Sequence, residues 1–354
     1  MALSADRRFT LRMAIALGMI VVLPFAFGLA MHWVFLEVVP TLYAEWVSGV
    51  PTDGLDAPGA NGLGFSYFAL TGLLVAGLVA QFVFGDRFVL RSSGARRVDR
   101  EDQPDLHARV ERLAQRADLP APDVAIVPED DVPNAFAVGR SPRSSTVVVT
   151  RGLLDTLDGD ELDAVLAHEL AHVKNRDGAL MTVAYLLPSL TYAVAAAAYF
   201  LLIHSPRALL HADFDVDDDA GPAILGIVAV FLVTSLLTLL ISALFWAASY
   251  LMHRILSRYR EYAADRGAAA LTDPFALASA LETIDEEMRV APDEDLRLED
   301  GGIEALYVAP LETELFERDD DALLSRDIFP ATHPPTEERV ERLTDAGEER
   351  FGAA

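Results

Sequence analysis

Two histidines and a glutamate lie in the five-residue run His168-Glu169-Leu170-Ala171-His172. If this run is helical, the imidazoles at positions i and i+4 lie one turn apart on the same face and can reach one metal ion. Glu169 then projects near the open coordination position, where a general base can act. The alternative is a pair of solvated helix histidines. The apolar residues around the run favour the metal site.

A third metal ligand is needed, because a catalytic zinc ion usually has three protein ligands and a water molecule. The sequence contains no cysteine, so that ligand must be a carboxylate or another histidine. Glu261 and Asp265 are again four residues apart on a predicted helix. One of them can bind the metal ion while the other accepts a hydrogen bond from a ligand histidine. Acidic pairs at this spacing usually decorate a solvated face, so the spacing alone does not assign these roles.

The elements that must position these residues can be read from periodicity. A helix is expected to begin near Asp158, where Asp158 and Glu161 have the spacing of a capping box. β-Branched runs predict short strands, and apolar residues at helical spacing predict two further helices. The expected strands are 124–127, 134–138 and 146–149, and the helices are 104–119 and 336–343. The acidic stretch 285–327 is expected to be a solvated insert or partly mobile loop.

Four stretches are long, apolar and nearly free of charge: 9–35, 65–84, 179–203 and 224–252. At about 1.5 Å per helical residue, even the shortest spans the roughly 30 Å hydrocarbon core of a bilayer. We therefore predict four transmembrane helices. Buried helices of a large soluble core are the alternative, and a cleaved signal peptide is an alternative for the first stretch.

The orientation of these spans follows from the arginines, because short positively charged flanks stay in the cytoplasm. Arginines precede the first span and follow the second and fourth, whereas the loop 40–64 has no Lys or Arg. We expect a multi-pass protein of the cell membrane with both termini and the catalytic domain in the cytoplasm. The expected parts of the chain are a first helix pair, a first cytosolic part, a second helix pair and a second cytosolic part, at 1–84, 85–178, 179–252 and 253–354.

The overall composition excludes several classes of protein. With 54 acidic and 28 basic residues the formal charge is -26, so a large basic nucleic-acid surface is not expected. Lys174 is the only lysine, so no Walker A loop exists, and no dinucleotide fingerprint occurs either. Neither nucleic acid nor nucleotide is therefore an expected partner. Acidic residues in excess, with arginine replacing lysine, are typical of proteins from a salt-loaded cytoplasm such as that of haloarchaea.

Four motifs together resemble the HtpX family of membrane-bound zinc metalloproteases, relatives of the CAAX prenyl endopeptidases. The similarity covers roughly 97–343. The first two motifs are Pro133-Asn134-Ala135-Phe136-Ala137, and His168 to His172 followed by Lys174-Asn175-Arg176-Asp177. The other two are Arg260-Glu261-Tyr262-Ala263-Ala264-Asp265 and Thr332-His333-Pro334-Pro335-Thr336-Glu337-Glu338-Arg339. The motif His168 to His172 is shared with many unrelated metalloproteases. The set of four motifs, interleaved with four predicted spans, is specific to this family.

The resemblance implies a mainly α membrane protein, with four transmembrane helices and a cytosolic α+β zincin-like (gluzincin) metalloprotease domain. It implies one Zn²⁺ per chain, bound by His168, His172 and Glu261, with Glu169 as general base. Asn134, Ala135, Phe136 and Ala137 would lie along a substrate-binding edge. The partners would be the lipid bilayer and polypeptide substrates, namely misfolded or membrane-associated proteins in quality control and the stress response. The long acidic insert and the acidic composition depart from the family pattern, so the cleavage preference stays open. The sequence does not identify the oligomeric state.

Three further residues have expected roles, and for two of them an alternative stays open. Asp265 is expected to accept a hydrogen bond from a ligand histidine. Asp177 is either a cap at a helix end or a similar partner of a histidine. His333 is either a surface-loop histidine or a donor to the oxyanion of the reaction, because the following proline holds its backbone extended and the resemblance places a histidine beside the active site.

Two other functions are compatible with four spans. A transporter or channel is one, although no span carries the paired charges that usually mark an ion path. A zinc-binding membrane scaffold or chaperone without proteolysis is the other, although a structural zinc site has no use for Glu169.

Overall fold

The computed structural model of the chain describes residues 7–47, 83–87, 89–184, 186–211, 221–290 and 334–352, together with the isolated residues 72, 76 and 79. The chain forms two compact units. The first contains residues 1–80 and 184–252, and the second contains residues 81–183 and 253–354. The long helix α9 (Gly221–Leu271) contributes to both units.

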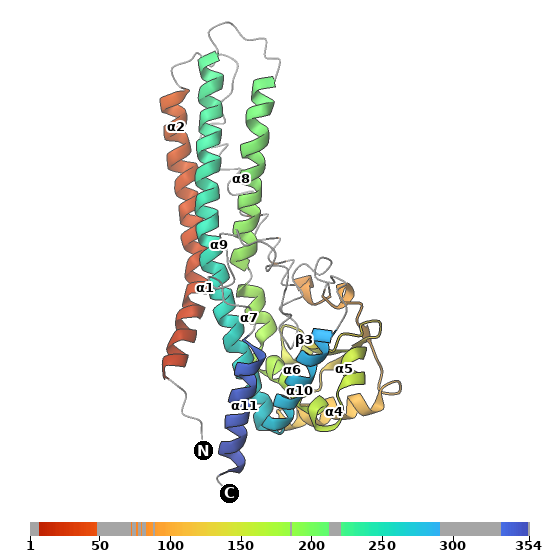
Figure 1. Cartoon of the computed structure of the whole chain (residues 1–354). Coiled ribbons are helices and arrows are strands. Elements are labelled where there is room, and N and C mark those ends of the chain that lie inside the picture. The colour runs from red at the N-terminus through yellow and green to blue at the C-terminus, as the bar shows by residue number, and fades with distance from the viewer. Residues whose placement is uncertain are drawn as a thin grey trace. The chain divides into compact units, whose positions relative to one another are not determined.

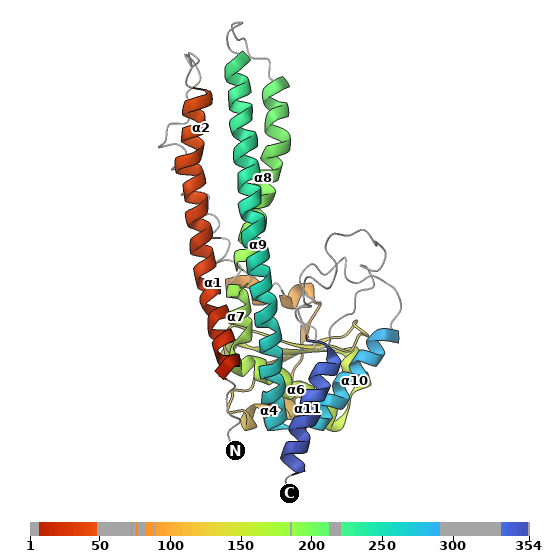
Figure 2. The same ribbon diagram turned by 60° about the vertical axis from the view of Figure 1, so that its left-hand side comes forward.

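The described residues of the first unit are helical, except for Val47 in the turn that follows α2. Its elements are α1 (Arg7–Trp33), the π-helix η1 (Val34–Val38), α2 (Val39–Trp46), α8 (Leu186–His211) and the first part of α9. Figures 1 and 2 show α1, α8 and α9 side by side. An apolar cluster joins them, with Phe27 of α1 packed edge to face against Phe245 of α9 at 5.4 Å between ring centroids.

Two described helical stretches, Gly18–Trp46 and Ile224–Leu271, are long and apolar enough to cross a membrane. α8 contains a shorter apolar stretch, Leu190–His204. The predicted span 65–84 lies almost entirely outside the described residues, so the total of four spans stays a prediction. Large apolar side chains on this unit are exposed, among them Phe25 at 72% and Leu244 at 68%. Water disfavours such a surface, and a bilayer would cover it.

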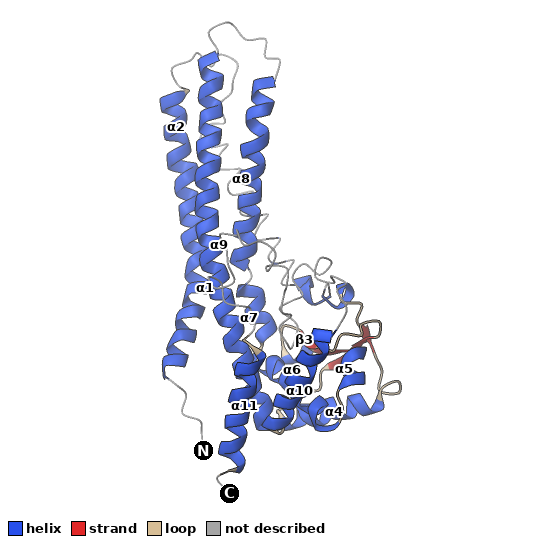
Figure 3. Ribbon diagram, viewed as in Figure 1, coloured by secondary structure: helices blue, strands red, loops and turns tan. Residues whose placement is uncertain are grey.

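The second unit contains a four-stranded sheet in the order β1-β2-β4-β3. Figure 3 shows its strands in red among the helices of this unit. The strands are β1 (Arg96–Arg97), β2 (Asp123–Val127), β3 (Ala135–Val138) and β4 (Thr146–Thr150). β2 and β4 are parallel, β1 is antiparallel to β2, and β3 is antiparallel to β4, with Phe136 opposite Val148. Among the described strands, β3 is therefore an edge strand.

Alternate residues of the strands point to the two faces of this sheet, as the period of two requires. Val147 and Val149 belong to the main apolar core, whereas Val148 belongs to a smaller cluster. β2 and β3 also contribute Val124, Ile126 and Ala135 to the main core, and helices supply most of its other residues. These helices are α4 (Pro104–Arg116), α5 (Arg151–Thr156), α6 (Gly159–Asn175), the end of α9, α10 (Pro274–Val290) and α11 (Thr336–Phe351). The 3₁₀-helix η2 (Pro142–Ser144) precedes β4, and α7 (Asp177–Ala184) follows α6.

The structure changes three expectations about these elements. The last helix continues to Phe351, eight residues beyond the predicted end. The unpredicted helix α10 includes 285–290, the start of the acidic stretch, while 291–333 lies outside the described residues. The predicted capping box is wrong, because the Asp158 side chain makes no capping hydrogen bond. Glu161 Oε1 instead accepts a hydrogen bond from Ser279 Oγ of α10 at 2.6 Å, a tertiary contact that local spacing does not predict.

Candidate metal centre

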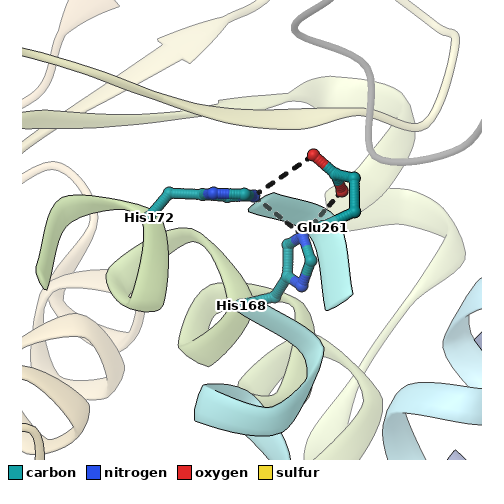
Figure 4. Close-up of side chains that lie close together, drawn as sticks. All are labelled: His168, His172 and Glu261. Atoms are coloured by element: carbon teal, nitrogen blue, oxygen red, sulfur yellow. Dashed lines mark hydrogen bonds and ion pairs between the residues drawn. The ribbon is translucent and has the colours of Figure 1, made fainter. Parts of the chain in front are cut away.

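The two histidines of the centre lie on one face of α6, as their spacing predicts. The side chain of His168 is fully buried and that of His172 is 11% exposed. Their rings meet edge to face, with 3.1 Å between the two Nε2 atoms. Both Nε2 atoms therefore point into the same small volume (Figure 4).

Glu261 of α9 closes this group. Its Oε2 lies 3.4 Å from His168 Nε2 and its Oε1 lies 3.6 Å from His172 Nε2. The three potential ligand atoms lie within 4.8 Å of one another. The two helices approach closely here, because a Cβ atom on Gly267 would lie only 2.7 Å from Ala171 Cβ. The small residues on α6 and α9 thus let Glu261 reach the histidines.

The Nδ1 atoms of both histidines face carboxylates. His168 Nδ1 lies 3.0 Å from Asp265 Oδ1, and His172 Nδ1 lies 2.7 Å from Asp177 Oδ2. Asp177 reaches back because Arg176, in the left-handed region at φ 59°, ends α6 and reverses the chain before α7. A carboxylate on Nδ1 places the proton there and leaves Nε2 free to bind a metal ion.

Two arginines complete the charged surroundings. Arg260 Nη2 lies 3.2 Å from Glu261 Oε1. Arg339 of α11 is fully buried and binds both oxygens of Asp265, at 2.9 and 2.7 Å. Sequence reasoning assigned a role to neither arginine, although both lie within motifs that it singled out.

Burial and charge shift the pKa values of this centre. Burial alone would lower the pKa of His168, but Asp265 and Glu261 more than compensate and raise it to about 9. Burial raises the pKa of Glu169, although the nearby histidines oppose that rise. Arg339 is charged at any working pH, because Asp265, Glu261 and Glu169 outweigh the effect of its burial and raise its pKa above the ordinary value. A carboxylate with a raised pKa is suited to accept and return a proton near neutral pH.

The donor set and its charge fit a divalent metal ion. The groups named above comprise four buried carboxylates and two guanidiniums. With neutral imidazoles and all four carboxylates ionised, these groups leave two negative charges, which a divalent cation would neutralise. The same negative charge favours the protonated form of His168 when no cation is bound, so the pKa of His168 is raised. Two imidazoles and a carboxylate are typical ligands of catalytic zinc.

The predicted substrate edge, Asn134 to Ala137, contains the strand β3 and the residue before it. Asn134, Ala135 and Phe136 are buried, and Phe136 packs in the smaller apolar cluster. These three side chains belong to the core, so a ligand can meet only the backbone edge of β3 and the half-buried side chain of Ala137. A small cavity at the end of this strand is lined by Ala137, Val138, Gly139, His172, Val173 and Gly178.

The structure thus brings His168, His172, Glu261 and Asp265 together and adds Asp177 as a partner of His172. Glu169 lies on the same helix turn, is 3% exposed and interacts electrostatically with both histidines. His333 lies outside the described residues, so its predicted role stays a prediction.

Comparisons with known proteins place the chain among metalloproteases. The family model described as Peptidase family M48 matches residues 100–346. "Protease HtpX homolog 2" of Methanosarcina mazei is 41% identical over 268 residues, covering 75% of this chain and 80% of the relative. "Protease HtpX homolog 1" of Streptomyces coelicolor is 36% identical over 351 residues, covering 97% and 96%. These matches confirm the family inferred from the motifs.

A solved structure, "Crystal Structure of S. mikatae Ste24p", is similar with a TM-score of 0.47 and 19% identity. The similarity covers 92% of this chain and 66% of that chain. At this score the likeness adds nothing to the assignment of the site.

Proposed function

Because this chain belongs to peptidase family M48 and is therefore a metalloprotease, we propose that it is an integral-membrane zinc endopeptidase whose active centre is the cluster on α6 and α9. The observation that carries this proposal is the convergence of His168, His172 and Glu261 within 4.8 Å. Glu169, buried on the same helix, supplies the base that hydrolysis requires.

His168, His172 and Glu261 would hold one zinc ion, with Asp265 and Asp177 orienting the two imidazoles through Nδ1. Zinc, when bound, supplies a Lewis acid and lowers the pKa of water towards neutrality. Glu169 accepts the proton of the attacking water and returns it to the leaving amine. Its burial supports this role, because a raised pKa matches the base to a proton transfer near neutral pH.

The substrate is an extended polypeptide that pairs with the backbone edge of β3 that no other described strand covers. Strand addition binds main-chain groups and demands little of the side chains, which suits misfolded or membrane-associated proteins. The cavity between the end of β3 and His172 lies beside this edge and supports the same placement. We further propose that His333 donates a hydrogen bond to the oxyanion.

Four spans would hold the enzyme in the cell membrane, with both chain ends and the catalytic domain in the cytoplasm. The helix pairs would be 1–84 and 179–252, and the protease parts 85–178 and 253–354. The support is the arginine distribution and the two long apolar helices. Reporter fusions test this topology, and a cytoplasmic signal from a fusion in the predicted loop 40–64, placed beyond the end of α2 at Trp46, would contradict it.

Proteolysis by the purified protein in detergent tests the proposed activity. Glu169→Gln should keep one zinc ion per chain and lose about a hundred- to ten-thousandfold in kcat, whereas Glu261→Ala should lose most of its zinc. Glu161→Gln is the matched control, because this carboxylate lies on the same helix but bonds Ser279. Wild-type protein that binds zinc and cleaves no polypeptide would support the zinc-binding scaffold instead.

A further inference from the structure

Arg339 is a buried cation that the C-terminal helix brings to the metal centre. Its side chain has no exposed surface. Nε donates to Asp265 Oδ2 at 2.9 Å and Nη2 donates to Asp265 Oδ1 at 2.7 Å. This two-point contact is the fork geometry in which arginine fixes the plane of a carboxylate, and lysine cannot reproduce it.

The same carboxylate faces a proposed metal ligand. Asp265 Oδ1, which accepts from Arg339, also lies 3.0 Å from His168 Nδ1. A carboxylate held at both oxygens cannot turn about its terminal bond, so its direction towards the imidazole is set by Arg339. The orientation of His168 in turn decides whether Nε2 points at His172 and Glu261.

We infer that Arg339 is a positioning residue for zinc binding, acting through Asp265 on His168, so that docking of α11 completes the metal centre. This inference rests on the proposed zinc function of the same site. Under this inference the zinc affinity depends on a helix that lies about 170 residues after His168 in the sequence.

Other contacts between α11 and α9 separate this role from simple helix docking. Arg258 of α9 and Glu338 of α11 pair at 3.0 Å. Arg350 Nη1 donates to the carbonyl oxygens of Ala269 and Thr272, at 2.6 and 3.0 Å. Arg350 therefore attaches α11 to the end of α9 through backbone carbonyls, away from Asp265, and is a matched control for Arg339.

The test measures the zinc dissociation constant of the full-length protein in detergent, by competition with a chromogenic chelator. Arg339→Lys, which keeps the charge and loses the fork, should bind zinc about ten- to a hundredfold more weakly, the usual effect of losing a group that orients a ligand histidine. Arg350→Gln should lower the thermal midpoint of the metal-free protein yet keep the wild-type zinc dissociation constant within twofold.

Zinc binding by Arg339→Lys within twofold of wild type would overturn the inference. Equal weakening in Arg339→Lys and Arg350→Gln would also overturn it, because both would then report helix docking. Wild-type protein without zinc would instead contradict the proposed function itself.

A second comparison applies if Arg339→Lys does not fold. Asp265→Asn and the double variant Asp265→Asn/Arg339→Met remove one or both partners of the buried pair. If Arg339 acts through Asp265, the two variants should have zinc dissociation constants within about threefold of each other. A further tenfold loss in the double variant would show a route that bypasses Asp265, such as the 3.8 Å approach of Arg339 to Glu261, and would overturn the inference.

Discussion

Replacing Asp177 by asparagine tests whether this carboxylate acts on His172 or serves only at the helix end where α7 begins. Asp177 is the first residue of α7, and its Oδ2 lies 2.7 Å from His172 Nδ1. Asparagine caps a helix as well as aspartate does and has nearly the same shape. A capping role alone therefore predicts no change in zinc binding.

The expected loss follows from the burial of this pair. The Asp177 and His172 side chains are 6% and 11% exposed, so water screens their interaction little. Loss of such a carboxylate typically weakens metal affinity ten- to a hundredfold. At about 1.4 kcal/mol per factor of ten, this corresponds to about 1.4–2.8 kcal/mol of zinc binding free energy.

The assay is the zinc dissociation constant of Asp177→Asn, measured by chelator competition at fixed pH and ionic strength. Asp105→Asn is the control, because Asp105 is an exposed carboxylate in the first turn of α4. It should bind zinc as the wild type does. A dissociation constant for Asp177→Asn within twofold of wild type would refute the reasoning and leave Asp177 as a helix cap.

Three further predictions concern packing and pH. Gly267→Ala should weaken zinc binding at least severalfold and lower the thermal midpoint, because the new Cβ atom would lie 2.7 Å from Ala171 Cβ and push α6 from α9; unchanged zinc binding would show that the helices yield without moving Glu261. Leu281→Ala, in the core and fully buried, should lower the unfolding free energy by about 2–5 kcal/mol, measured by thermal or denaturant unfolding in detergent, with an exposed alanine substitution as control. In the metal-free protein the folded pKa of His168, about 9, exceeds its unfolded value of 6.5, so this group stabilises the fold fully below pH 6.5 and loses that contribution as the pH rises through 9. The thermal midpoint after chelator treatment should therefore fall between pH 6.5 and 9.5 more steeply than in His168→Gln, and equal slopes would contradict the shift.

The local elements of the site were predictable from the sequence because short-range periodicity determines them. Two histidines four residues apart share a helix face in any α-helix, so their proximity needed only the prediction that α6 forms. The β-branched runs likewise predicted β2, β3 and β4 to within one residue at each end. The family, too, followed from four motifs read in order.

Tertiary structure decided which partner each of these side chains meets. Glu161 had the spacing of a capping residue, yet α10 placed Ser279 within 2.6 Å of it. Asp177 had two possible roles until the left-handed turn at Arg176 brought it to His172. Arg339 lies 74 residues after Asp265, and no periodicity links positions on separate helices. The sequence by itself therefore determined the family and the helix face on which the two histidines lie. Packing between α6, α9 and α11 decided which carboxylates and which buried arginine surround these histidines. The physical reason is that long-range contacts depend on how elements dock and not on their local spacing.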